Sequence, residues 1–462
     1  MTDSAAVQPL FGQLATIFGR RWLSVSIVAT FTIGSAICGA APNGATLIAG
    51  RAIQGIGSGG INMLSDVIIS DLVPLRERGN FIAIVLAVYA VGTSLGPFTG
   101  GILVEKTTWR WVFLITLPFG AAAILLLLLF LRVKSTSISM REGLARIDLV
   151  GNVTIILSTI AILVPLTYVE SPYPWTSWRT LVPLLLGFCG FIIIPFYETS
   201  NFCRNPLLPP QLFTNRTSVI VYIITFINSM LLYWITFFLP VYFQSVKGSS
   251  PARTGVQMLP IVLVAVPGAV IAVILLSKYG RYRPLHQVGF AIGTLGGGLF
   301  IRFDRTTPAV EWILYQVIGG LGSGMILNTL LPAFQACHPE KHQALVTGSW
   351  AFIRSFGNTW GVAIPAAIFN NRMHKLNGVI YDERVREALT SGRAYEFGPR
   401  LLKEAATPEL ADMIADVYAR ALKWVWIFAM GLGVLAFLLT LTEKEIRLRT
   451  TLETEYGLED EK

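Results

Sequence analysis

Long apolar runs separated by short polar connectors dominate the sequence. About twelve of these runs reach the roughly 20 residues that a helix needs to cross a bilayer. They lie roughly at 22–41, 45–70, 81–103, 110–131, 148–168, 179–198, 217–243, 255–277, 285–301, 310–334, 343–369 and 421–441. The connectors, such as "PLRERGN" and "KYGRYRP", carry proline, arginine or both. This pattern predicts an all-α polytopic membrane protein.

The composition narrows the class of protein further. Of the 462 residues, 53% are hydrophobic and 14% are charged, whereas a soluble protein has about 25% charged residues. The deficit is spread along the whole chain, which excludes a soluble enzyme with a single membrane anchor. The sequence offers no nucleophile–base set, metal-ligand cluster or phosphate-binding loop. We therefore expect no enzyme activity, no metal ion and no cofactor.

The lysines and arginines gather in alternate connectors. The connectors on the side of Arg20 and Arg21, together with the tail after residue 441, hold the larger share of them. The positive-inside rule therefore places this side in the cytoplasm, and it explains the net charge of +9 without a nucleic-acid partner. Arg51 and Arg354 instead lie inside apolar runs, where charges usually face a bundle interior or an aqueous cavity. Each of the two either makes a structural pair or serves a functional site.

Two glycine-containing motifs occupy the first third of the chain. In "GQLATIFGRR", Gly12 and Gly19 permit a tight turn and close helix approach, while Arg20 and Arg21 hold that turn at the cytoplasmic surface. In "AGRAIQGIGSGG", residues 49–60, helical spacing places Arg51, Gln54 and Gly55 on one face. The glycines that follow leave a smooth surface for a neighbouring helix.

The stretch "GTSLGPFTGG", residues 92–101, concentrates residues that weaken helices inside an apolar run. Gly92, Gly96 and Gly100 repeat every four residues and so line one helix face, and Gly101 follows them. Pro97 removes a backbone hydrogen bond and bends the helix. The stretch is either a bent, closely packed seam that resists leakage or only a tight helix contact. A fourth motif, "WRWVFLITLPFG", follows at residues 109–120.

In this order and at these separations, the four motifs resemble those of the major facilitator superfamily. "GQLATIFGRR" is similar to its loop motif between the second and third helices, and "LIAGRAIQGIG" to its fourth-helix motif. "GTSLGPFTGG" matches the antiporter motif G-x-x-x-G-P-x-x-G-G at every fixed position. "WRWVFLITLPFG" resembles a segment of the fourteen-helix drug:proton antiporters, and the later stretches resemble their fungal members, the multidrug and toxin efflux pumps.

The sequence departs from this family at three places. Thr16 stands where the loop motif has Asp, and Thr116 stands where the sixth-helix motif has Asn. Family members also carry a first helix before the stretch "AAVQPLFG", so about 13 of 14 helices are expected here. We favour a wrongly assigned gene start over a genuine truncation as the explanation.

The resemblance implies a major facilitator fold of two pseudo-symmetric helical bundles with a two-helix insert. The expected boundaries are an amino-terminal bundle at 1–131, a cytoplasmic linker at 132–147, the insert at 148–198, a carboxy-terminal bundle at 211–441 and a cytoplasmic tail at 442–462. The second bundle includes a long outer loop at 371–420, which is either a lid or a solvated amphipathic helix. Thr407 and Pro408 predict the start of a helix that runs into the last span.

The implied mechanism is proton-coupled export by alternating access, with the proton gradient as the energy source. Arg51, Gln54 and Arg354 are candidates for proton coupling or charge relay. Asp66 is the acidic residue well inside a span, and Asp71 lies near a span end. These two carboxylates either carry protons or pair with Arg20 on the cytoplasmic side, and pairing is slightly favoured.

The expected substrate is a bulky, amphipathic organic compound such as a drug, toxin or secondary metabolite, because aromatic walls with few polar groups suit such molecules. Candidate cavity residues are Tyr222, Asn228, Tyr233, Trp234, Asn328 and Gln335. Any one of the aromatic residues is alternatively a packing or interface residue. We expect a monomer in the lipid bilayer of the plasma membrane, with the vacuolar membrane as the alternative. The rival functions are proton-coupled uptake of an iron chelate or nutrient, and a truncated remnant that does not transport.

Overall fold

The computed structural model describes most of the chain. The described residues are 2–74, 106–131, 147–168, 176–200, 210–339, 342–390 and 394–448, with scattered single residues between these ranges. In this part of the chain all regular structure is helical, and eight helices are long and apolar enough to cross a membrane. This confirms the predicted all-α polytopic membrane protein.

The amino-terminal group of helices begins with a helical hairpin. Its described helices are α1 (Thr2–Phe18), α2 (Arg20–Gly39), α3 (Gly44–Leu72), α5 (Trp111–Leu114) and α6 (Thr116–Phe130). Gly19 joins α1 to α2 with a φ of +78°, a conformation that residues with side chains rarely adopt. The predicted span at 110–131 is interrupted at Ile115, which ends α5 and precedes α6.

Two helices follow in the segment predicted as the insert. They are α8 (Leu149–Tyr168) and α9 (Trp178–Glu198), which pack against each other, and α8 also packs against α1. Aromatic side chains of α9 reach the second group of helices, since the Phe191 ring lies 6.1 Å from that of Phe352 and 5.5 Å from that of Phe356. The insert therefore contacts both groups.

The carboxy-terminal group forms the larger part of the molecule. Its long helices are α10 (Arg216–Ser245), α12 (Leu259–Tyr279), α13 (Arg283–Leu299), α14 (Ala309–Leu327), α16 (Gln343–Leu376) and α19 (Pro408–Leu441). Short helices are η1 (Pro210–Phe213), α11 (Pro251–Gln257), η2 (Phe300–Arg302) and α15 (Leu330–Ala336). The predicted span at 310–334 is thus two helices, which separate at Asn328 and Thr329.

The segment 371–420, predicted as a long outer loop, is largely helical. It holds the end of α16, η4 (Asn377–Val379), α17 (Glu383–Thr390), α18 (Ala394–Glu404) and the first turns of α19. The predicted start of α19 is confirmed, because the Thr407 side chain accepts a hydrogen bond from the Leu410 backbone N–H at 3.2 Å. Leu389 and Tyr418 are buried in the core of the carboxy-terminal group, so the segment is packed against that group rather than solvated on all sides.

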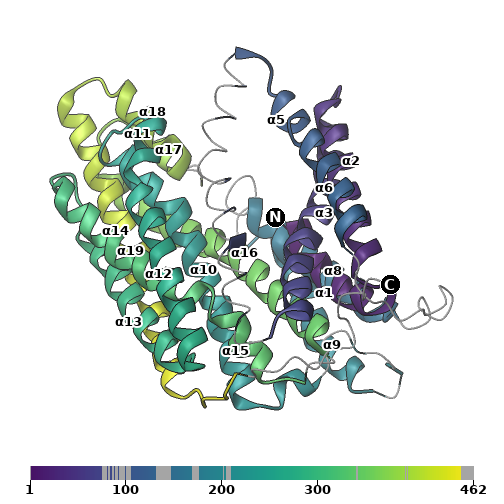
Figure 1. The fold of residues 1–462 in the computed structure, drawn as a ribbon. Coiled ribbons are helices and arrows are strands. Elements are labelled where there is room, and N and C mark those ends of the chain that lie inside the picture. The colour runs from purple at the N-terminus through teal and green to yellow at the C-terminus, as the bar shows by residue number, and fades with distance from the viewer. Residues whose placement is uncertain are drawn as a thin grey trace.

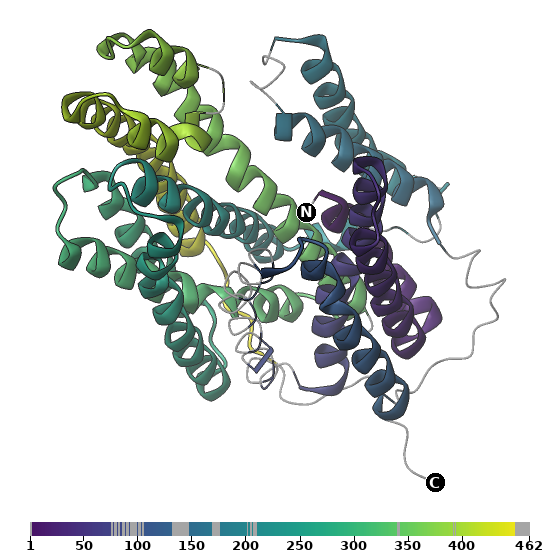
Figure 2. The same cartoon turned by 90° about the horizontal axis from the view of Figure 1, so that it is seen from above.

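The two groups lie side by side and meet at one end. Figure 1 shows that they come together where α1 lies beside α16 and diverge toward the end that carries α5, α17 and α18. Figure 2 shows the same two groups from above, with α1, α2 and α3 in purple and blue on one side and the green and yellow helices on the other.

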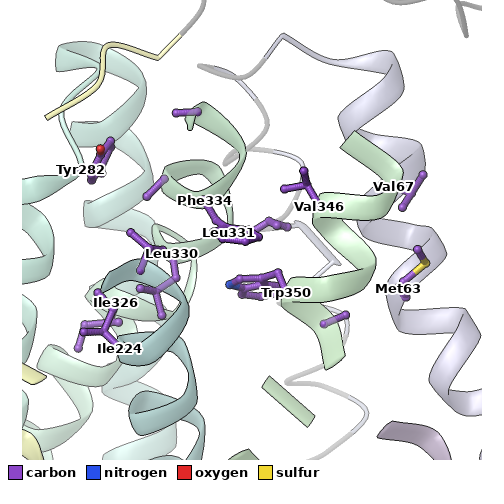
Figure 3. Packing of buried hydrophobic residues seen from close by; sticks show 14 of the residues in the cluster. Met63, Val67, Ile224, Tyr282, Ile326, Leu330, Leu331, Phe334, Val346 and Trp350 are labelled. Carbon is purple, nitrogen blue, oxygen red and sulfur yellow. The ribbon is translucent and has the colours of Figure 1, made fainter. Parts of the chain in front are cut away.

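A hydrophobic core crosses the contact between the groups. It joins Met63 and Val67 of α3 to Val346 and Trp350 of α16, and it continues to Phe334 of α15. In Figure 3, Trp350 points toward Leu331 and Phe334, whereas Met63 and Val67 lie on the other side of α16. Apolar side chains from several helices therefore join the two groups.

Candidate functional site

Helices α1 and α16 of the two groups approach each other closely at two glycines. A Cβ atom at Gly348 would lie 3.2 Å from the Gly12 Cα atom and 3.2 Å from the Met63 Cε atom. A Cβ atom at Gly12 would lie 3.1 Å from the Ala344 carbonyl oxygen. Glycine in both helices therefore lets the two backbones touch at the end that carries the α1–α2 turn.

An ion pair lies beside this contact. The Arg20 Nε atom donates to the Asp71 Oδ2 atom at 2.6 Å, and its Nη1 atom donates to the Ala15 carbonyl oxygen at 2.8 Å. Both charged side chains are buried. Asp71 is thus a partner of Arg20, as one of the two sequence alternatives held. Arg21 takes another direction, and its Nη2 atom donates to the Leu128 carbonyl oxygen of α6 at 2.6 Å.

The motif around Arg51 ties α3 to α2. The Arg51 Nη1 atom donates to the Gln54 Oε1 atom at 2.6 Å, and the Gln54 Nε2 atom donates to the Ser35 Oγ atom at 2.7 Å. Gln54 is buried, whereas Arg51 is exposed and its guanidinium lies 5.8 Å from the centre of the Phe113 ring. Arg51 and Gln54 therefore share one helix face, and their hydrogen bonds remain within the amino-terminal group.

Two half-buried residues of opposite charge lie on helices of the two groups that pack against each other. They are Asp66 of α3 and Arg354 of α16. The Arg354 guanidinium lies 4.6 Å from the centre of the Trp350 ring, and Trp350 in turn donates to the Thr225 Oγ1 atom of α10 at 3.1 Å. The arginine is thus packed against an aromatic ring that is itself held by the carboxy-terminal group.

The antiporter motif lies mostly outside the described residues. Gly92 is described as helical and exposed, and a Cβ atom there would meet nothing within 4 Å. Gly96, Pro97, Gly100 and Gly101 are outside the described residues. The predicted packing role of this motif stays a prediction.

The four candidate cavity residues of α10 differ in how deeply their side chains are buried. Tyr222 is partly buried, with its ring 5.6 Å from that of Phe334, and Asn228 is buried in the same helix. Tyr233 is half-buried and stacks on Phe237 at 6.1 Å. Trp234 is fully buried in the core of the carboxy-terminal group. This position of Trp234 favours the alternative in which it is a packing residue.

Of the two remaining candidates, Asn328 precedes α15 and Gln335 lies within it. Asn328 caps the end of α14, is 3% exposed, and its Nδ2 atom has no hydrogen-bond partner among the described residues. The Gln335 Nε2 atom donates to the Thr347 Oγ1 atom of α16 at 2.9 Å. Gln335 thus links α15 to α16, while the Asn328 amide retains an unused donor in the interior.

A buried polar cluster at the inner end of α8 was not among the sequence candidates. The Gln13 Oε1 atom accepts from the Asn152 Nδ2 atom at 3.0 Å and from the Asp148 backbone N–H at 3.3 Å. The Tyr197 hydroxyl donates to the Asp148 Oδ1 atom at 2.9 Å. The signal in the sequence was Gln13 inside the first motif, together with Asp148 and Asn152 one helical turn apart.

The residues that follow α19 contact the start of α13 in the carboxy-terminal group. The His286 Nδ1 atom lies 3.0 Å from the Glu443 Oε2 atom, and both side chains are fully buried. The Tyr282 hydroxyl donates to the Lys444 carbonyl oxygen at 2.8 Å, and burial raises the pKa of Tyr282. Nearby, burial lowers the pKa of His338 to about 4, and its Nε2 atom lies 2.8 Å from the Ser218 Oγ atom.

The fold and this site define a class of protein. Apolar helices form two groups that pack against each other where α1 and α3 lie beside α16, and both groups carry charged residues within their apolar helices, which is typical of a membrane transporter. The family model described as Major Facilitator Superfamily matches residues 4–362. The chain belongs to the major facilitator superfamily.

Similar proteins come from fungi. The chain is 49% identical over 462 residues to the MFS-type transporter TwmF of Talaromyces wortmannii, covering 99% of this chain and 84% of that protein. It is 43% identical to the MFS efflux transporter aclA of Aspergillus oryzae, covering 99% of this chain and 83% of that one. The MFS-type efflux transporter phmH of Phaeosphaeria nodorum is also 43% identical and is covered to 82% of its length, against 100% of this chain.

Solved structures share the fold. The human organic anion transporter MFSD10 superposes with a TM-score of 0.57 at 14% identity, over 95% of this chain and 81% of that one. The proton:xylose symporter XylE gives a TM-score of 0.54 at 15% identity, over 91% and 88% of the two chains. At these identities the likeness shows the major facilitator fold alone.

Proposed function

We propose that the chain is a proton-coupled exporter of amphipathic organic compounds, such as drugs, toxins or secondary metabolites, and that it works by alternating access. The observation that carries this proposal is the position of two half-buried, oppositely charged residues, Asp66 in α3 and Arg354 in α16, on helices of the two groups that pack against each other. An ionised Asp66 attracts Arg354 and favours the closed inner contact. Protonation removes that attraction, so proton binding and the movement of the two groups are linked.

The direction of transport is supported by the relatives. Several of them carry the word efflux in their names, including aclA and phmH. The antiporter motif at residues 92–101 points the same way. The uptake of an iron chelate or nutrient finds no comparable support, and neither does a remnant that does not transport. The proposed pump uses the proton gradient in place of a cofactor, acts as a monomer, and lies in the plasma membrane rather than the vacuolar membrane.

The proposed cycle follows from the charges. With the inner contact closed, Asp66 takes up a proton from the outer side, which weakens its attraction to Arg354 and lets the contact of α1 with α16 open. Release of that proton to the cytoplasm and binding of substrate then restore the closed contact. Proton and substrate therefore move in opposite directions.

The test uses yeast that lacks its own drug pumps and vesicles from the same cells. We expect cells that express the chain to retain less rhodamine 6G, and an imposed proton gradient to drive dye flux in the vesicles. Asp66→Asn is expected to abolish flux that depends on the gradient while leaving dye exchange at equal pH, and Arg354→Lys should keep more flux than Arg354→Gln. Unchanged dye retention together with no gradient-driven flux by the unmodified chain would refute the proposal.

A further inference from the structure

A basic cavity lies between α16 and α19. Its volume is about 280 Å³, and its lining includes Arg372 and Lys375 from α16 and Arg420, Lys423 and Trp424 from α19. Leu376 and Ile427 complete the lining. Four cationic and three apolar side chains therefore line the cavity, and the proposed transport cycle does not use it.

Of the four cations, one has a carboxylate partner. Arg420 pairs with Asp416, one turn away on the same helix, at 2.7 Å. Within the described part of the chain, Arg372, Lys375 and Lys423 have no carboxylate within ion-pair distance. Like charges that converge on one small cavity repel each other, so a bound anion stabilises the arrangement.

The cavity lies at the level of lipid headgroups. Lys423 is followed by the apolar stretch from Trp424 to Leu441, which ends α19. These residues span about 27 Å, close to the thickness of the hydrocarbon core. The Arg372 guanidinium stacks 3.7 Å from the centre of the Trp424 ring, and tryptophan is enriched at membrane interfaces. The cations therefore lie at the interface opposite the tail after Leu441.

An apolar groove lies further along α19, on the side of the membrane interior. It has a volume of about 390 Å³ and runs between α13 and α19, where Leu295 and Gly298 face Met430, Val434 and Phe437. Ile427 of the cavity and Met430 of the groove are three residues apart and so are neighbours on one helix face. Leu295 is 59% exposed, which leaves the groove open on the side of the lipid chains.

We propose that the cavity binds the phosphate headgroup of an anionic phospholipid whose acyl chain lies in the groove between α13 and α19. The cations supply charge complementarity for the phosphate, and the arginines supply paired donors for its oxygens. A free phosphate or a soluble anion would use the same cations, but it would leave the apolar groove empty. The position of the groove on the next turns of α19, beyond the cations of the cavity, favours the lipid.

The experiment measures lipid binding to the purified full chain by native mass spectrometry. Phosphatidylglycerol is compared with phosphatidylcholine of the same acyl chains. We expect phosphatidylglycerol to bind more tightly, and Arg372→Gln with Lys423→Gln to weaken it roughly thirtyfold. Arg384→Gln with Lys403→Gln, which changes two exposed outer cations away from the cavity, serves as the matched control and should have no effect. Equal retention by the unmodified chain and the cavity variant would overturn the proposal.

A substitution in the groove distinguishes the binding of a lipid from the binding of a free anion. Val434→Trp fills the groove and leaves the four cations in place, so it should weaken phosphatidylglycerol binding while the thermal shift produced by inorganic phosphate stays the same. The lipid proposal would be refuted if Val434→Trp bound phosphatidylglycerol as well as the unmodified chain does while the cavity variant lost both ligands. The cavity would then bind only a soluble anion. If removal of the Arg372 stacking prevents folding, Lys375→Gln with Lys423→Gln takes its place.

Discussion

At the scale of single residues, the Arg20–Asp71 ion pair lies beside the contact between α1 and α16. Both side chains are buried, and the arginine is also held by the Ala15 carbonyl oxygen. A buried charge that loses its partner is far more costly than an exposed one, because water cannot take the partner's place. The pair therefore fixes the α1–α2 turn to the inner end of α3.

Removal of one partner is expected to destabilise the protein. Asp71→Asn leaves the Arg20 charge buried, and we expect a loss of about 3–5 kcal/mol in the free energy of unfolding. Arg400→Gln, which breaks the exposed pair with Glu404, is the matched control and should change stability by less than about 0.5 kcal/mol. Thermal unfolding in detergent, followed by tryptophan fluorescence, measures both. Equal midpoints for the two variants would contradict a structural role for the pair.

The buried side chain of His338 makes the free energy of unfolding depend on pH. Burial, aided by the nearby His342, lowers the pKa of His338 from 6.5 to about 4. Between these two pH values the unfolded chain binds a proton at this residue and the folded chain does not. The contribution of His338 to the free energy of unfolding is therefore fully present above pH 6.5. It decreases as the pH falls toward 4, by up to about 1.4 kcal/mol per pH unit. His338→Gln should flatten the profile of unfolding midpoint against pH, whereas an unaltered profile would argue against this assignment. His374→Gln, at an exposed position, is the control.

The charged residues show which contacts a sequence can predict. The Arg51–Gln54 bond was predictable because helical spacing brings the two side chains together. The Arg20–Asp71 pair was one of two stated alternatives, since both residues lie near the same membrane face. Asp66 and Arg354 lie on helices far apart in the chain, and no local period encodes the packing of α3 against α16. The same holds for the Ser35 partner of Gln54.

At the scale of helices, apolar length predicted most elements but not their interruptions. The span at 45–70 is α3 with its ends moved by one or two residues. The break between α14 and α15 was missed, because Asn328 and Thr329 interrupt an otherwise apolar run without a proline or glycine between them. For segment 371–420 the sequence offered an amphipathic helix as one alternative, but not its packing against the carboxy-terminal group, where Leu389 and Tyr418 are buried.

The insert helices are attached to the transport fold by polar contacts. Asn152→Leu removes the donor at 3.0 Å from the Gln13 side chain, and we expect a loss of about 1–3 kcal/mol in the free energy of unfolding. The lower stability should appear as a lower unfolding midpoint and as faster proteolysis of the connectors around α8 and α9. Val153→Leu, at an exposed position of the same helix, is the control and should leave both measurements unchanged. The same midpoint in both variants would show that the cluster does not hold the insert.

At the scale of the whole molecule, the two groups meet through a small, tightly packed contact and diverge beyond it (Figure 1). Such a geometry gives one end of the molecule a seal that depends on a few glycine positions. The sequence predicted the two bundles through its resemblance to a family. It did not predict which end is closed, because that depends on the balance between two arrangements of the same helices.

A bulky side chain at the glycine contact is expected to shift this balance. A Cβ atom at Gly348 already lies 3.2 Å from the Gly12 backbone, so Gly348→Leu forces α1 and α16 apart. Overpacking of this kind costs about 1–3 kcal/mol, which lowers the population of the closed inner contact by roughly tenfold to a hundredfold. We expect a cysteine placed at the buried Ala15, in a chain without its other cysteines, to react faster with a maleimide added from the cytoplasmic side. Gly431→Leu, where a Cβ atom would meet nothing within 4 Å, is the matched control. The closed contact would not depend on these glycines if Gly348→Leu and Gly431→Leu gave the same labelling rate.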